Sequence, residues 1–76
     1  MMDGKRFCER LRQARKKAGM SATQVAVALY TDQSVISRYE TGCVMPKVDR
    51  VALMARLYGV SMDWLCGMEA LTDEDN

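Results

Sequence analysis

Hydrophobic residues recur along the chain at intervals of three and four positions, and no segment alternates hydrophobic and polar residues with a period of two. The first spacing is typical of amphipathic helices, whereas the second would indicate strands. Four glycines each follow a periodic segment, where a left-handed residue commonly ends a helix: Gly19, Gly42, Gly59 and Gly67. The pattern therefore predicts an all-α fold of five short helices.

The expected helices cover about residues 5–17, 21–29, 33–41, 48–58 and 61–66. Ser21 and Gln24 have the spacing of a capping box, and Asp32 and Ser61 precede the third and fifth helices as N-caps. The inward-facing positions that follow from the periodicity are Phe7, Leu11, Ala14, Ala18, Val25, Ala26, Leu29, Val35, Ile36, Tyr39, Val48, Val51, Ala55 and Tyr58, with Trp64 and Leu65 closing the core.

Only three residues, Tyr30 to Asp32, separate the second expected helix from the third. Two helices joined this tightly cross steeply, as in a helix-turn-helix motif, where the second helix presents its outer face to a DNA groove. That outer face carries hydroxyl, amide and guanidinium groups in place of the usual Glu and Lys: Gln33, Ser34, Ser37, Arg38 and Thr41. Such groups suit base edges, while the alternative is a solvated helix that happens to be rich in hydroxyls.

Composition is compatible with one globular domain, since the 76 residues are 49% hydrophobic and 28% charged. Charge is distributed unevenly, because residues 1–47 contain nine Lys/Arg against four acids, and residues 48–76 contain two Arg against six acids. This distribution suits a domain that presents one end to a polyanion, although a basic first helix could also be an ordinary solvated face. We expect a domain over residues 1–69 and an acidic, disordered tail over 70–76.

Several chemistries are disfavoured by what the sequence lacks. It has no histidine, and Cys8, Cys43 and Cys66 are too widely spaced for a metal site, so we expect reduced thiols, no metal and no cofactor. Because the sequence has no histidine, no nucleophile–base spacing and no phosphate-binding glycine loop, we expect that the protein is not an enzyme. No apolar run approaches a membrane span or a signal peptide, which predicts a cytoplasmic protein without membrane partners.

From about residue 10 to residue 67 the chain resembles the phage-repressor and Cro family of helix-turn-helix DNA-binding proteins. The matching segments are LRQARKKAGMSATQVA, QSVISRYETG, a proline a few residues on, and YGVSMDWLCG. Their order and spacing carry the specificity, because the second segment alone is a moderate signal. The resemblance implies a lambda-repressor-like domain of five helices with the helix-turn-helix at the second and third.

The resemblance also implies roles for individual residues. Side chains of the third helix would contact bases in the major groove: Gln33, Ser34, Ser37 and Arg38. Phosphate contacts would come from the start of the second helix, the loop after the third and the first helix: Ser21, Thr23, Thr41, Cys43, Lys47, Arg12 and Lys16. Arg15 and Glu40 would form a structural ion pair, because an unpaired Glu40 at the edge of the buried arc is costly. The alternative is an exposed Glu40.

Two positions depart from the family pattern. The second helix begins with Ala22, where members commonly have a Gln that binds both phosphate and the recognition helix, so that contact is either absent or made by Thr23. Tyr30 stands where the turn usually has Gly, and a positive φ at this position would cost about 1 kcal/mol. Tyr30→Gly should then stabilise the fold, unless the packing of the ring matters more.

One such domain recognises only half a site, so we expect a homodimer on double-stranded DNA. The candidate dimer seam consists of apolar residues off the inner face: Leu53, Leu57, Met62, Met68 and Leu71. Stray surface apolar residues are the alternative. The resemblance favours a transcriptional repressor that blocks polymerase at an operator. The alternative is a DNA-binding antitoxin, which uses the same fold and also binds a toxin.

Overall fold

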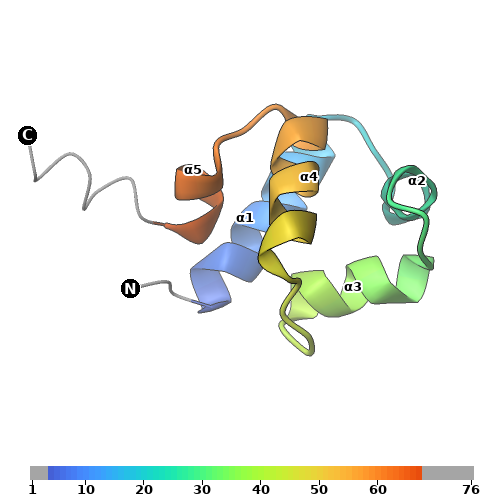
Figure 1. Ribbon diagram of the computed structural model, residues 1–76, viewed down its shortest axis with the longest axis horizontal. Helices are drawn as coiled ribbons and strands as arrows, with labels where there is room; N and C mark the ends of the chain where they lie inside the picture. The colour runs from blue at the N-terminus through green and yellow to red at the C-terminus, as the bar shows by residue number, and fades with distance from the viewer. Residues whose placement is uncertain (1–3, 68–76) are drawn as a thin grey trace, which may run out of the picture.

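The computed structural model describes residues 4–67, which form five helices and no strand (Figure 1). The helices are α1 (Gly4–Lys17), α2 (Ala22–Ala28), α3 (Gln33–Thr41), α4 (Val48–Tyr58) and α5 (Met62–Cys66). The all-α, five-helix prediction is therefore confirmed. The predicted domain boundary at residue 69, the tail over 70–76, Met68 and Leu71 lie outside the described residues. None of the helices in residues 4–67 is long and apolar enough to cross a membrane.

Helix ends follow the glycine and serine signals of the sequence. Gly42, Gly59 and Gly67 adopt the left-handed conformation directly after α3, α4 and α5. Ser61 Oγ accepts a hydrogen bond from the backbone N–H of Trp64 and so caps α5. Asp32 occupies the predicted N-cap position of α3, although its side chain makes no capping hydrogen bond.

The core lies where α1, α3, α4 and α5 converge, and α2 covers one end of it. Its fully buried large side chains come from every helix: Phe7, Leu11, Val25, Ile36, Met54 and Leu65. Met54 was not expected in the core, although it lies next to the inward positions Val51 and Ala55. Predicted inward positions of Ala18 and Val48 are wrong, since Ala18 is exposed beyond the end of α1 and Val48 is 73% exposed at the first residue of α4.

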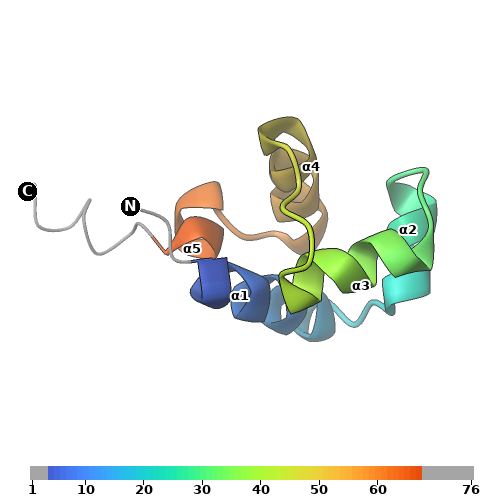
Figure 2. The ribbon, with the colours of Figure 1, turned by 90° about the horizontal axis from the view of Figure 1, so that it is seen from below.

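α1 is central to the helix packing, because it contacts α3, α4 and α5. In Figures 1 and 2, α2 and α3 meet at one end of the molecule, and α5 lies beside the N-terminal part of α1 at the other. Arg10 joins α1 to α5, because its guanidinium lies 4.7 Å from the centroid of the Trp64 ring and donates to the backbone carbonyl of the same residue. This contact adds a cation–π interaction to the half-buried indole.

Candidate nucleic-acid interface

The outer face of α3 is polar and exposed. Gln33, Ser34, Arg38 and Thr41 are exposed and Ser37 is half-buried, whereas Ile36 and Tyr39 are buried on the opposite side. The helix is therefore held by its apolar side, and its hydrogen-bonding side faces outward. This is the arrangement that a helix needs if it is to enter a groove of DNA.

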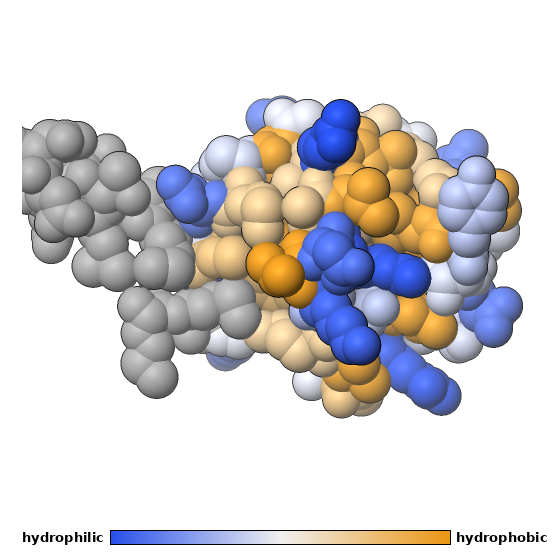
Figure 3. Space-filling model, in the orientation of Figure 1, coloured by the Kyte–Doolittle hydropathy of each residue, from blue (hydrophilic) through white to orange (hydrophobic). Residues whose placement is uncertain are grey.

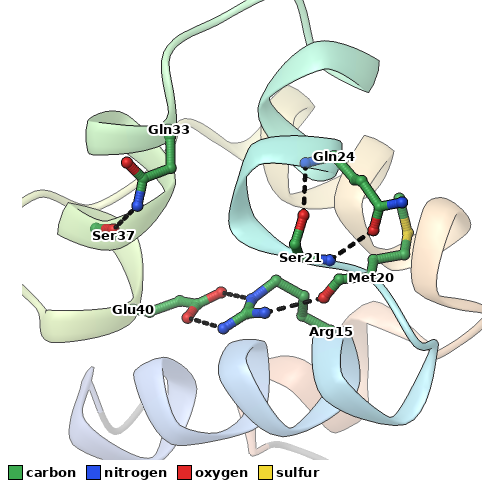
Figure 4. A network of polar contacts seen from close by, with 7 residues as sticks. All are labelled: Arg15, Met20, Ser21, Gln24, Gln33, Ser37 and Glu40. Atoms are coloured by element: carbon green, nitrogen blue, oxygen red, sulfur yellow. Dashed lines mark hydrogen bonds and ion pairs between the residues drawn. The ribbon is translucent and has the colours of Figure 1, made fainter.

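Two polar contacts organise this face in the free protein. Gln33 Nε2 donates to Ser37 Oγ across 3.3 Å, one helical turn apart (Figure 4), and Thr41 Oγ1 donates to the backbone carbonyl of Arg38 across 3.3 Å. Within residues 4–67, the guanidinium of Arg38 has no hydrogen-bond or ion-pair partner. Its five N–H donors are thus available to an external acceptor.

An ion pair joins the C-terminal end of α3 to α1. Arg15 Nε lies 2.7 Å from Glu40 Oε2 and its second terminal nitrogen lies 3.1 Å from Glu40 Oε1, which makes the pair bidentate (Figure 4). The remaining terminal nitrogen of Arg15 donates to the Met20 carbonyl across 2.9 Å, directly before Ser21, the N-cap residue of α2. The hydrogen bond to Glu40 raises the pKa of Arg15 further, although partial burial opposes this. One guanidinium therefore links α1, α3 and the segment that leads into α2.

The N-terminus of α2 is capped by its own side chains. Ser21 Oγ accepts from the Gln24 backbone N–H across 3.1 Å, and the Ser21 backbone N–H donates to Gln24 Oε1 across 2.8 Å, so the predicted capping box is confirmed (Figure 4). The box occupies the backbone N–H groups of Ser21 and Gln24. Those of Ala22 and Thr23 have no intrahelical acceptor, and the Ser21 hydroxyl proton also remains free to donate. Thr23 is exposed beside them.

The other predicted phosphate contacts lie on the loop after α3 and on α1. Thr41, Cys43 and Lys47 are all exposed, and Thr41 Oγ1 lies 3.4 Å from Cys43 Sγ. Arg12 and Lys16 are exposed one turn apart on α1. In the described part of the chain no hydrogen bond or ion pair connects Arg12 or Lys16 to α2 or α3. The loop residues therefore follow α3 directly, whereas Arg12 and Lys16 lie on α1, which packs against α3.

Of the candidate dimer residues, the structure describes Leu53, Leu57 and Met62, and these three do not all line the same groove. Leu53, which is 50% exposed, and the partly buried Leu57 line a groove of about 380 Å³ together with residues from the end of α2. Its full lining is Ala28, Leu29, Tyr30, Leu53, Arg56 and Leu57. Met62 is partly buried against the core and does not line this groove. The sequence did not predict that Tyr30 and the end of α2 line this groove, because the groove depends on how α2 and α4 are placed relative to each other.

The thiols are not arranged for metal binding. Cys8 is buried, Cys66 half-buried and Cys43 exposed, and all three are free. Burial raises the pKa of the Cys8 and Cys66 thiols, which keeps them protonated at neutral pH. Between residues 4 and 67, no three Cys, Asp or Glu side chains are close enough together to hold a metal ion.

Comparison with known proteins gives a consistent set of matches. A protein family described as helix-turn-helix matches residues 11–65. The chain is 37% identical over 68 residues to the uncharacterized HTH-type transcriptional regulator YobD of Bacillus subtilis (strain 168), covering 90% of this chain and 58% of YobD. It is 31% identical over 67 residues to the HTH-type transcriptional regulator ImmR of the same organism, covering 88% of this chain and 53% of ImmR. The chain thus spans little more than half the length of these relatives.

Proposed function

The chain belongs to the helix-turn-helix family, and from this membership we propose that it is a sequence-specific DNA-binding transcriptional regulator. The observation that carries the proposal is the outer face of α3, where Arg38 and three short polar side chains are presented to solvent by a helix that a bidentate ion pair holds on α1. The names of the two relatives, both HTH-type transcriptional regulators, support it.

In this proposal α3 lies in the major groove and its side chains distinguish base pairs. The fork of Arg38 can donate to O6 and N7 of one guanine, and the amide of Gln33 can pair with the N6 and N7 edge of adenine. Gln33 would first release Ser37, which costs little, because their 3.3 Å hydrogen bond is long and exposed. Ser34 and Ser37 are short enough to let the helix backbone approach the base edges.

Backbone phosphates would be bound on both sides of α3. On one side are the Ser21 hydroxyl, Thr23 and the free N–H groups at the start of α2, and on the other are Thr41, Cys43 and Lys47. These contacts would set the depth and register of α3 in the groove, without selecting a sequence. Arg12 and Lys16 would add outer contacts.

The protein would act as a repressor in dimeric form. Two domains would bind half-sites one helical turn apart, and the pair would occlude a promoter from polymerase. The partly exposed Leu53 and Leu57 support a self-association surface on α4, because large apolar side chains beside a groove are typical of protein contacts. Met62, Met68 and Leu71 remain predicted members of the seam.

Base recognition by Arg38 can be tested by selecting bound duplexes from a random library, first with the wild-type chain and then with Arg38→Ala. We expect Arg38→Ala to weaken binding to the selected site by about 1–3 kcal/mol and to relax the preference at one or two base pairs. Lys17→Ala is the matched control, because Lys17 is an exposed cation outside the proposed interface. A wild-type protein that binds no duplex even at low salt would contradict the proposed function. An equal loss on all sequences would reduce Arg38 to a backbone contact.

A further inference from the structure

Asp32, the last residue of the turn between α2 and α3, carries a carboxylate that the free protein does not use. It occupies the N-cap position of α3 with the extended backbone of such a residue, yet its side chain accepts no hydrogen bond from the first turn. The N-cap residues of α2 and α5, Ser21 and Ser61, both accept one. The Asp32 side chain is exposed and has no hydrogen-bond or ion-pair partner among residues 4–67. Capping of α3 therefore does not explain the acid at this position.

The backbone that leads to Asp32 is fixed by hydrogen bonds. The N–H of Thr31 donates to the Ala26 carbonyl across 2.9 Å, and the N–H of Val35 donates to the Asp32 carbonyl across 3.0 Å. Between them the chain turns at Tyr30, whose φ of +56° is the only positive φ outside glycine within residues 4–67. The Asp32 side chain thus leaves a defined backbone at the N-terminal end of α3. This is the end of a recognition helix that contacts base edges.

A free negative charge is unusual on a surface that is to meet phosphates, because it lowers the attraction to every duplex. Residues 20–42, which contain α2, the turn and α3, have two acids, Asp32 and Glu40. Glu40 is paired with Arg15, so Asp32 carries the one unpaired negative charge of this segment. On the face drawn in Figure 3, hydrophilic side chains project at the lower right, where α3 lies in the same view of Figure 1. The cost of the charge is offset only if DNA supplies a donor to it.

We propose that Asp32 selects cytosine, with its carboxylate accepting a hydrogen bond from the N4 amino group in the major groove. This inference rests on the proposed function and names one base that the same site reads. An ionised carboxylate can only accept hydrogen bonds. The major-groove edges of guanine and thymine present acceptors, whereas cytosine N4 and adenine N6 are donors. Guanine and thymine would therefore repel the carboxylate.

Cytosine fits the carboxylate better than adenine does. Adenine N6 lies between two acceptors, its own N7 and O4 of the paired thymine, while cytosine N4 has an acceptor on one side and the C5–H group on the other. The carboxylate can approach cytosine from the C5 side without facing a second acceptor. On other sequences the charge of Asp32 stays unpaired near phosphates, so it opposes binding to wrong sites as well as favouring the right one.

Selection of bound duplexes from a random library tests this proposal, with wild type, Asp32→Asn and Asp63→Asn. Asn has the shape of Asp without the charge and is an equally good N-cap residue, so α3 should not be weakened. Asp63 is exposed on α5 at the other end of the molecule and is the matched control for the lost charge. We expect wild type and Asp63→Asn to prefer cytosine at the same position by about tenfold or more, and Asp32→Asn to lose that preference. An unchanged cytosine preference in Asp32→Asn would overturn the inference.

A cycle of changes in protein and base shows whether Asp32 touches N4 directly. Wild type and Asp32→Ser, which keeps a good N-cap residue, are each measured on the selected duplex and on the same duplex with 2-pyrimidinone, a cytosine without its 4-amino group, at the selected position. We expect the base change to weaken wild type about tenfold more than Asp32→Ser. Equal losses would mean that Asp32 makes no contact with N4. A wild type that binds no duplex would contradict the proposed function itself, whereas selective binding that does not depend on Asp32 would contradict this inference alone.

Discussion

Tyr58 shows how tightly single residues are constrained in this small core. Its hydroxyl is shielded from solvent and has no hydrogen-bond partner among the described residues, although the Arg15–Glu40 pair is close enough to influence it. Burial of the phenol, reinforced by the negative charge of Glu40 and opposed by Arg15, raises the pKa of Tyr58 from 10 to about 12. Charging this side chain inside the fold is therefore more costly than charging it in the unfolded chain.

Alkaline unfolding should reveal that difference. Because the pKa of Tyr58 is about 12 in the folded protein and 10 when exposed, its contribution to stability is complete below pH 10 and is lost as the pH rises toward 12. Urea denaturation of wild type and Tyr58→Phe between pH 7 and pH 12 would measure this. We expect near-equal stability or a small gain for Tyr58→Phe at pH 7, since no hydrogen bond is lost. Above pH 10 the free energy of unfolding of Tyr58→Phe should exceed that of wild type by a growing amount. If the two free energies instead change in parallel with pH, the phenol of Tyr58 titrates with its ordinary pKa.

At the scale of helices, the orientation of α3 depends on a contact that reaches across the sequence. The helix has nine residues, and an isolated helix of this length is marginal in water. Ile36 and Tyr39 anchor it by burial, and the Arg15–Glu40 pair fixes its last turn to α1. The exposed face that we assign to DNA is thus positioned by interactions on its opposite side.

Removing one partner of the Arg15–Glu40 ion pair should destabilise the fold more than replacing both partners with apolar residues. Arg15→Met would leave Glu40 largely buried without its partner, which we expect to destabilise the fold by about 3 kcal/mol. The double variant Arg15→Met with Glu40→Leu should recover much of that loss, because no charge is left behind. Thermal or urea unfolding of the two singles and the double measures the coupling. Strictly additive losses would show that the side chains contribute independently and that the ion pair does not hold α3 on α1.

Helix boundaries and the buried stripe were predictable where local chemistry decides them. Left-handed glycines and the Ser21 and Ser61 caps mark ends whatever the rest of the chain does, so they could be identified from sequence. Val48 continues the apolar stripe of α4 but lies in its first turn, past the edge of the core, and is exposed. Whether a residue at the edge of the core is buried depends on which helix lies opposite it. The hydrophobic periodicity of one helix does not show which helix that is.

The same limit applies to the candidate site. The outer face of α3 followed from its wheel positions, because a helix inside a recognisable motif has only one free side. The groove beside Tyr30 did not, because it arises where α2 stands apart from α4, as both ribbon views show. The sequence indicated that Tyr30 was unusual in a turn. Only the arrangement of α2 and α4 shows what lies next to it.

The whole molecule carries a charge asymmetry that suits the proposed orientation on DNA. Residues 1–47, which contain α1 to α3 and the following loop, have nine Lys/Arg and four acids, whereas residues 48–76 have an acidic excess. With a net charge of only +1, attraction to DNA must come from this distribution and not from the total. Seven of these nine cations lie on α1, which packs against α3, so we expect the side of the domain formed by these two helices to meet the phosphates first.

Salt dependence of DNA binding measures how many of these cations meet phosphates. The logarithm of the binding constant should fall linearly with the logarithm of salt concentration, by about 0.9 for each neutralised phosphate. Lys47 is exposed beside α3 with no hydrogen-bond or ion-pair partner in the described chain, so Lys47→Ala should make the slope shallower by about 0.9 while leaving the preferred sequence unchanged. Lys17→Ala removes the same charge away from the proposed interface and should leave the slope as it is. If both variants lower it equally, the cations act through the overall charge of the domain and Lys47 makes no phosphate contact.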